Sequence, residues 1–235
     1  MDITIYRGRT PELGAADIRV VIDVIRAFTT THVALRRGAR SIWLAETVDD
    51  ARRLAAAGSG RVLAGERNAL APPGFDLGNS PAEMAVADVT GREVVLTTTN
   101  GVRATLHAAF DGPLIVTGFS NGEATVRHLR SLIAGGRRRI QLIASHPTGD
   151  EDLACAQWIG TQLTGGHSPD ADAVRRRILD SRAAAKFLDP NQPLYRSRDI
   201  DYCRHLIRSP WAMVAGADDG TVVVERRRLN EFSDH

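Results

Sequence analysis

Residues 97 to 101, Thr97-Thr98-Thr99-Asn100-Gly101, bring three hydroxyls, an amide and a glycine together. They follow the apolar run 94–96 and precede residues 102–109, whose pattern predicts a helix. A turn between a strand and a helix N-terminus presents free backbone N–H groups, which bind anions. Arg103, in the first helical turn, adds a guanidinium that can hold an oxyanion through two hydrogen bonds. The stretch indicates an anion site, although threonines that end a strand before an ordinary Asn-Gly turn give the same pattern.

Polar side chains also stand at the ends of three other predicted strands. They are Asp23 with Arg26, Glu66 with Arg67, and His146 with Glu151 and Asp152. If the sheet is open and parallel, these strand ends converge on one edge. Carboxylates hold a hard cation through oxygen, while arginines and helix N-termini hold a phosphate. The combination favours magnesium-assisted phosphoryl chemistry.

Each of these groups also has a purely structural interpretation. Asp23 can cap a helix, Glu66 and Arg67 can form a surface pair, and Glu151 with Asp152 can complement a helix dipole. The functional interpretation depends on the coincidence of four polar strand ends in one chain.

The other reactive residue types add one candidate. His146 stands at a strand end, and we expect it to act as an acid or base. His32, His107 and His128 fall at helical positions, where packing or solvent exposure is expected, and Cys155 lies inside a helix rather than at its N-terminus. The chain has no phosphate-binding P-loop, nucleophile-elbow serine, zinc-protease helix or dinucleotide fingerprint.

Apolar runs alternate with helical patterns along the chain and supply the elements that would position these residues. The expected strands cover 18–24, 41–45, 61–67, 93–99, 113–119 and 139–145. The expected helices cover 27–35, 48–57, 102–110, 121–133, 151–163, 170–188 and 199–207. This alternation predicts an α/β fold, a three-layer α/β/α sandwich around a mostly parallel or mixed sheet. A C-terminal hairpin is expected from 211–215 and 221–225.

The 235 residues fit one domain, 1–235, with two lobes at 1–165 and 166–235. Residues 68–81 form a loop too long for a plain connection, and such loops are often functional. The loop ends in Ser80-Pro81-Ala82-Glu83, a helix-capping pattern. We expect the tail 230–235 to be frayed.

Composition narrows the class of protein and its partners. Apolar residues make up 43% of the chain, no segment is long enough to span a membrane, and no signal peptide is visible. Two cysteines make neither a disulfide framework nor a zinc site, so a reducing cytoplasm is the simplest location. A net charge of +2 gives no reason to expect nucleic acid. The basic runs 137–139, 175–177 and 226–228 are interpreted as solvated faces or as contacts in a homodimer.

Several motifs together resemble the 2-phosphosulfolactate phosphatase family of the coenzyme M pathway. The matching stretches are Val-Ile-Asp-Val-Ile-Arg-Ala at 21–27, Leu-Ala-Gly-Glu-Arg at 63–67, Gly-Phe-Asp-Leu-Gly-Asn-Ser-Pro at 74–81, Leu-Thr-Thr-Thr-Asn-Gly at 96–101 and Glu-Asp-Leu-Ala-Cys-Ala at 151–156. The resemblance covers roughly residues 18 to 165.

The resemblance implies a Mg²⁺-dependent phosphatase that cleaves the 2-phosphate ester of a small sulfonated hydroxy acid, 2-phosphosulfolactate. It implies catalytic roles for Asp23, Arg26, Glu66 and Arg67, to which His146 is added from its strand-end position and not from the resemblance. It implies metal binding by Asp23, Asp76, Glu151 and Asp152. It implies substrate binding by Asn79, Ser80, Thr98, Thr99, Asn100, Gly101 and Arg103. Direct attack by water and a phospho-aspartate intermediate on Asp23 both remain open.

The chain departs from the family pattern at Ser145-His146-Pro147, where the family usually has Cys-Ala-Gly. This turn stands where a substrate can be contacted, so the chemistry can be kept while the substrate differs. Two alternatives follow. One is a phosphatase or lyase that acts on a related non-sulfonated phospho-acid in a specialised pathway. The other is a non-catalytic anion-binding module. The density of carboxylates argues against it, because a site that only binds anions gains nothing from acidic side chains.

Overall fold

The computed structural model describes residues 1–165 and 170–229; the predicted frayed tail lies outside them. Its strands are β1 (Asp2–Arg7), β2 (Ile18–Ile22), β3 (Ser41–Leu44), β4 (Val62–Gly65), β5 (Leu77–Gly78), β6 (Glu93–Thr97), β7 (Leu114–Thr117), β8 (Arg139–Ala144), β9 (Trp211–Asp218) and β10 (Thr221–Arg228). Its helices are α1 (Ala27–Arg36), α2 (Val48–Ala57), α3 (Pro81–Met84), α4 (Gly101–His107), α5 (Gly122–Ala134), α6 (Asp150–Thr164), α7 (Ala171–Leu179), α8 (Arg182–Leu188) and α9 (Arg198–Cys203), with a 3₁₀ turn at Phe119–Asn121.

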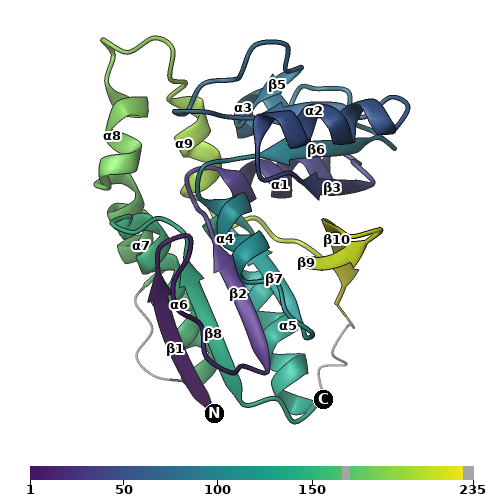
Figure 1. Ribbon diagram of the computed structural model, residues 1–235. Helices are drawn as coiled ribbons and strands as arrows, with labels where there is room; N and C mark the ends of the chain where they lie inside the picture. The colour runs from purple at the N-terminus through teal and green to yellow at the C-terminus, as the bar shows by residue number, and fades with distance from the viewer. Residues whose placement is uncertain (166–169, 230–235) are drawn as a thin grey trace.

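The strands form one mixed, mostly parallel sheet in the order β1-β8-β2-β7-β9-β10-β3-β6-β4-β5. Two parallel blocks, β1-β8-β2-β7 and β3-β6-β4-β5, are joined by the antiparallel β9–β10 hairpin. The hairpin pairs antiparallel with β7 on one side and with β3 on the other. Figure 1 shows the strands of the two blocks lying at a wide angle to one another. The predicted α/β class, mixed sheet and C-terminal hairpin are confirmed.

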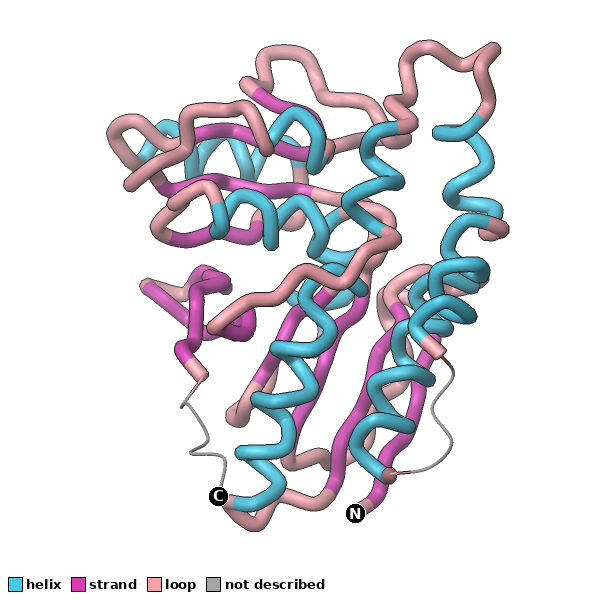
Figure 2. Tube along the Cα trace, turned by 180° about the vertical axis from the view of Figure 1, so that it is seen from behind, coloured by secondary structure: helices cyan, strands magenta, loops and turns pink. Residues whose placement is uncertain are grey.

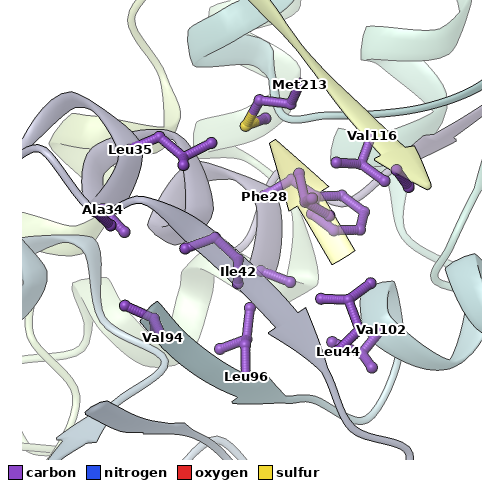
Figure 3. Close-up of a cluster of buried hydrophobic side chains, with 14 of the residues drawn as sticks. Phe28, Ala34, Leu35, Ile42, Leu44, Val94, Leu96, Val102, Val116 and Met213 are labelled. Atoms are coloured by element: carbon purple, nitrogen blue, oxygen red, sulfur yellow. The ribbon is translucent and has the colours of Figure 1, made fainter. Parts of the chain in front are cut away.

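Helices cover both faces of the sheet, which gives the predicted three layers (Figure 2). One face packs against α1, α3 and α4, and this core includes Phe28, Leu35, Leu96 and Met213 (Figure 3). On the other face, α5, α6 and α7 cover the first block and α2 covers the second. The strands β2 and β7 are mostly apolar because the sheet is buried on both sides there.

The structure differs from the sequence prediction in three places. Strand β1 was not predicted, and it pairs in parallel with β8 at the edge of the sheet. The predicted helix 170–188 is two helices: α7 ends at Leu179, and Ser181 caps α8 by accepting the N–H of Ala184. The helix predicted at 199–207 is the shorter α9. The predicted capping of α3 is confirmed, since the Ser80 hydroxyl accepts the N–H of Glu83.

In the part of the chain that the structure describes, no helix combines the length and the apolar character needed to cross a membrane.

Candidate active site

A cavity of about 770 Å³ lies where the carboxyl ends of the two strand blocks meet. The blocks run in opposite directions along the sheet, so a single parallel edge does not form. Their wide angle nevertheless brings the polar segments after β2, β4, β6 and β8 around one space (Figure 1). The cavity is lined by nine of the predicted site residues: Asp23, Arg26, Glu66, Asn79, Thr98, Thr99, Asn100, His146 and Glu151.

Asp23 connects the N-termini of two helices. One carboxylate oxygen accepts the N–H of Ala27 at 2.9 Å, at the start of α1, and the other accepts the N–H of Gly101 at 2.9 Å, at the start of α4. A Cβ on Gly101 would lie 2.6 Å from Asp23 Oδ2, so only glycine permits this approach. Burial raises the pKa of Asp23 to about 6, and the charges of Glu151 and Glu66 add to the shift. Asp23 therefore caps helix α1 and also presents a titratable carboxylate to the cavity.

Asp152 does not line the cavity; it lies behind Asp23 and is 1% exposed. Its oxygens accept the N–H of Val24 at 2.8 Å and of His146 at 3.0 Å, which joins the segments after β2 and β8. The Ser145 hydroxyl lies 3.1 Å from Asp152 Oδ2 and 3.3 Å from Asp23 Oδ2. Burial raises the pKa of Asp152 well above its usual value, and the neighbouring acids reinforce the shift. This residue supports the site from outside the cavity.

Glu151, at the start of α6, lines the cavity although only 1% of its surface is exposed. Its Oε2 has no hydrogen-bond partner among the described residues. Burial raises the pKa of its carboxyl group. A buried carboxylate oxygen without a donor is costly unless a cation, a proton or a substrate donor satisfies it.

Glu66 fastens the end of β4 to the end of β6. Its oxygens accept the N–H groups of Thr99 at 2.6 Å and of Ala69 at 2.7 Å, so the surface pair with Arg67 does not form. Thr98 accepts the N–H of Val102 at 3.1 Å and so caps α4. The Thr-Thr-Thr-Asn-Gly stretch is thus a helix-capping turn, and Thr98, Thr99 and Asn100 also line the cavity, so anion binding by this stretch stays a prediction.

Arg26 is fixed by an acid that the sequence did not single out. Its Nη1 donates to Asp199 Oδ2 at 2.6 Å, and its Nη2 donates to the carbonyl of Ala69 at 2.9 Å. Asp199 is fully buried and also accepts the Ser80 hydroxyl at 2.6 Å. The Arg26 guanidinium lies 4.6 Å from the centre of the Phe187 ring. Arg26 therefore reaches the cavity in one defined orientation.

Helix α8 forms a wall of the cavity that was also missed. The residues of α8 and those just before it that line the cavity are Asp180, Ser181, Arg182, Ala183, Lys186 and Phe187. His146 faces the same region: burial lowers its pKa, and the charges of Lys186 and Arg182 lower it further. Lys186 is the single lysine in the chain, a signal visible in the sequence. Asp199 offered no comparable signal, since an acid in the first turn of a helix is commonplace.

The remaining predicted residues lie outside the cavity. Gly101 and Asp152 lie behind Asp23, and Ser80 is occupied by Asp199 and by the cap of α3. Asp76 is exposed and accepts the N–H of Leu63 at 2.8 Å, which fastens the loop to β4. Arg67 is exposed and Arg103 is partly exposed, and neither lines the cavity. The chemical roles of all these residues stay predictions.

The donor set suits a cation that is shared with a substrate. Across the described ranges, no three side chains of His, Cys, Asp or Glu converge to form a complete metal cage. Mg²⁺ needs no such cage, because it is usually held by one or two carboxylates together with substrate phosphate and water. Asp23 and Glu151 supply carboxylates, and Asn79 adds a buried amide oxygen without a partner. These residues fit Mg²⁺, while Asp76 lies elsewhere.

The fold and the cavity define an α/β protein whose strand ends surround a polar cavity. Comparison with known proteins identifies the family of the chain. The family model for 2-phosphosulpholactate phosphatase matches residues 6–206, and this protein belongs to that family.

Relatives match nearly the whole chain. A protein of Bacillus subtilis named probable 2-phosphosulfolactate phosphatase is 42% identical over 226 residues, which cover 96% of this chain and 99% of the relative. A protein of the same name from Thermus thermophilus is 41% identical over 230 residues, covering 92% and 94%. One from Deinococcus radiodurans is 41% identical, covering 85% and 88%.

Proposed function

We propose that this protein hydrolyses the phosphate ester of a small anionic hydroxy acid, with 2-phosphosulfolactate as substrate and Mg²⁺ as cofactor. The observation that carries the proposal is one cavity that is lined both by the acids Asp23 and Glu151 and by the cations Arg26 and Lys186. The membership of the chain in the phosphatase family gives this cavity its chemistry. Acids alone would repel a phosphate, and cations alone would bind it without need of buried carboxylates.

Asp23 and Glu151 would hold Mg²⁺, whose chemistry there is to polarise the phosphate and neutralise its charge. Both carboxyl groups have raised pKa values because they are buried, and a bound cation offsets that cost. Arg26 offers its charge to the phosphate oxygens while Asp199 holds its position. The hydroxyls of Thr98 and Thr99 line the same space and suit the remaining oxygens.

Hydrolysis adds the oxygen of water to phosphorus, breaks the phosphorus–ester oxygen bond and moves one proton from water to the leaving oxygen. We assign this proton transfer to His146. Burial and the charges of Lys186 and Arg182 lower its pKa, so its ring is neutral and can accept a proton at neutral pH. Its Nδ1 accepts the N–H of Thr148 at 3.2 Å, so Nδ1 is the nitrogen without a proton, and it takes up the proton when this hydrogen bond breaks.

The experiment that tests the proposal measures phosphate release from 2-phosphosulfolactate, 2-phospholactate and phosphoglycolate, with Mg²⁺ and with a chelator. The expected result is Mg²⁺-dependent release that is fastest with the sulfonated substrate and is lost in Asp23→Asn. Faster release from a non-sulfonated substrate would move the protein to a different pathway. Anion binding without turnover, unchanged by the chelator, would replace the enzyme with a binding module.

The covalent and direct routes give different products on rapid quenching. A phospho-aspartate intermediate leaves one phosphate on Asp23, detectable by mass spectrometry of the peptide that contains it. Quenched active enzyme without that modification supports direct attack by water.

A further inference from the structure

Acidic and basic side chains from different elements line the cavity. Asp23, Glu66 and Glu151 stand at the ends of strands and helices of the sheet, whereas Arg182 and Lys186 stand on α8. Its volume of about 770 Å³ lies in the range of ~300–1,000 Å³ typical of pockets that enclose whole small molecules. A phosphate group held by Asp23 and Glu151 with a cation would leave Lys186 and Arg182 of α8 for the rest of the substrate.

Lys186 and Arg182 are four residues apart, so they lie on the same face of α8. Neither forms an ion pair with any residue in the described ranges. Lys186 is half-buried and its ammonium lies 5.3 Å from the ring centre of Phe187. Desolvating a cation without an acid partner is unfavourable, and an anionic ligand removes that cost.

The acids of this wall do not cancel its positive charge. Asp150 lines the wall but is held by Arg177 through contacts of 2.6 and 2.8 Å. Asp180 lines it as well and is exposed. With Asp150 already paired, Lys186 and Arg182 leave the wall with an excess of positive charge.

Helix α8 is held firmly enough to place these cations. Ser181 caps its first turn, and Phe187 packs with Ala184 and Ile200 in a small buried cluster. The Phe187 ring also contacts the guanidinium of Arg26, so α8 is connected to the residue that faces the phosphate. A side chain held on such a helix can discriminate between substrates by position.

We propose that Lys186, assisted by Arg182, binds the acidic group on the carbon skeleton of the substrate, a carboxylate or a sulfonate, and so selects phosphate esters that carry a second anion. This inference rests on the proposed function for its substrate class. It adds α8 as the element that distinguishes acidic phosphate esters from neutral ones.

Kinetics of Lys186→Met test the inference when compared on two esters, 2-phosphosulfolactate and isopropyl phosphate, which has no second anion. Loss of a charge-assisted contact raises KM for the acidic ester about 10- to 100-fold and leaves kcat/KM for isopropyl phosphate within about twofold. Arg182→Gln has a smaller effect, about threefold, because Arg182 is exposed. Lys186→Arg restores most of the binding. An exposed arginine on α7 outside the cavity, changed in Arg176→Gln, is the matched control and has no effect.

A second measurement does not depend on turnover. Because Lys186 is the only lysine, an amine-reactive reagent labels one side chain besides the N-terminus, and the modified peptide is quantified by mass spectrometry. Sulfoacetate, which has both acidic groups but no phosphate, slows labelling of Lys186 and leaves labelling of the N-terminus unchanged. Separate arms with acetate and methanesulfonate show which acidic group is bound.

Two results would overturn the inference. The first is an equal loss of kcat/KM on both esters in Lys186→Met, which would make Lys186 part of the phosphate site. The second is labelling of Lys186 that none of the three anions slows. Protection by sulfoacetate in a protein that hydrolyses none of the esters would retain the subsite and reject the phosphatase proposal.

Discussion

Asp199→Asn breaks the buried ion pair that holds Arg26 at the cavity. The Asp199 side chain is fully buried, and its Oδ2 lies 2.6 Å from Arg26 Nη1. Its Oδ1 accepts the Ser80 hydroxyl at 2.6 Å and the N–H of Ala82 at 3.1 Å. Asparagine keeps the size of the side chain and one acceptor oxygen, but it presents a neutral group to a buried guanidinium.

The expected loss of stability is large. Removing one partner of a buried ion pair costs about 3–5 kcal/mol, because the other charge stays buried without compensation. Arg26 keeps its contacts with the Ala69 carbonyl and the Phe187 ring, so we expect a loss near the lower end, about 3 kcal/mol. Since small domains unfold at a cost of ~5–15 kcal/mol, this change is a substantial fraction of the total.

Urea unfolding at pH 7 measures the effect. Asp201→Asn is the matched control: it lies on the same helix, its side chain is 60% exposed, and it pairs with Arg204. The control loses under ~1 kcal/mol. In the double variant Arg26→Gln, Asp199→Asn, the loss is smaller than the sum of the single losses. Equal losses in Asp199→Asn and Asp201→Asn, or fully additive losses, would refute the account of this pair.

Three further predictions concern the site. Burial raises the pKa of Asp23 from 3.8 to about 6. Between those values the folded protein binds more protons than the unfolded chain, so the free energy of unfolding rises as pH falls from 7 to 4, by about 2 kcal/mol relative to Asp23→Asn in urea unfolding. A flat difference would contradict this. Gly101→Ala forces Asp23 away and abolishes phosphate release. The control is Gly160→Ala in α6, where the nearest atom to the added Cβ would lie 3.7 Å away, so this variant keeps its activity and gains up to about 1 kcal/mol in the free energy of unfolding. An active Gly101→Ala would contradict the placement of Asp23. Glu151→Gln raises the Mg²⁺ concentration for half-maximal phosphate release at least tenfold, while the exposed Glu46→Gln does not; unchanged Mg²⁺ dependence would exclude Glu151 as a ligand.

Sequence reasoning predicted the elements whose residues carry a local pattern. The buried strands β2, β6 and β8 are mostly apolar and are followed by polar residues, so both the strands and their polar ends could be predicted. Strand β1 was missed because it is an edge strand, and partial exposure of its residues weakens the apolar pattern. The C-terminal hairpin could be predicted as a hairpin, but its central place in the sheet depends on distant pairing with β7 and β3.

The residues of the candidate site likewise fall into those that a local sequence pattern predicts and those that only distant contacts bring to the cavity. Asp23 and Glu66 stand directly after strands, and Glu151 stands in the first turn of the helix that follows β8, where the fold class predicts ligand-binding groups. Asp199 reaches Arg26 across 173 residues of sequence, and no local pattern reports such a contact. The wall formed by α8 was hidden for a related reason: one long polar helix was predicted for 170–188, and its break at Ser181 sets the direction of α8.

The most direct test of the account is phosphate release from 2-phosphosulfolactate by the wild type and by Asp23→Asn, each with Mg²⁺ and with a chelator. The account predicts release only by the wild type with Mg²⁺, at a rate above that on 2-phospholactate and phosphoglycolate. Release by Asp23→Asn at the wild-type rate, or release that the chelator leaves unchanged, would contradict it.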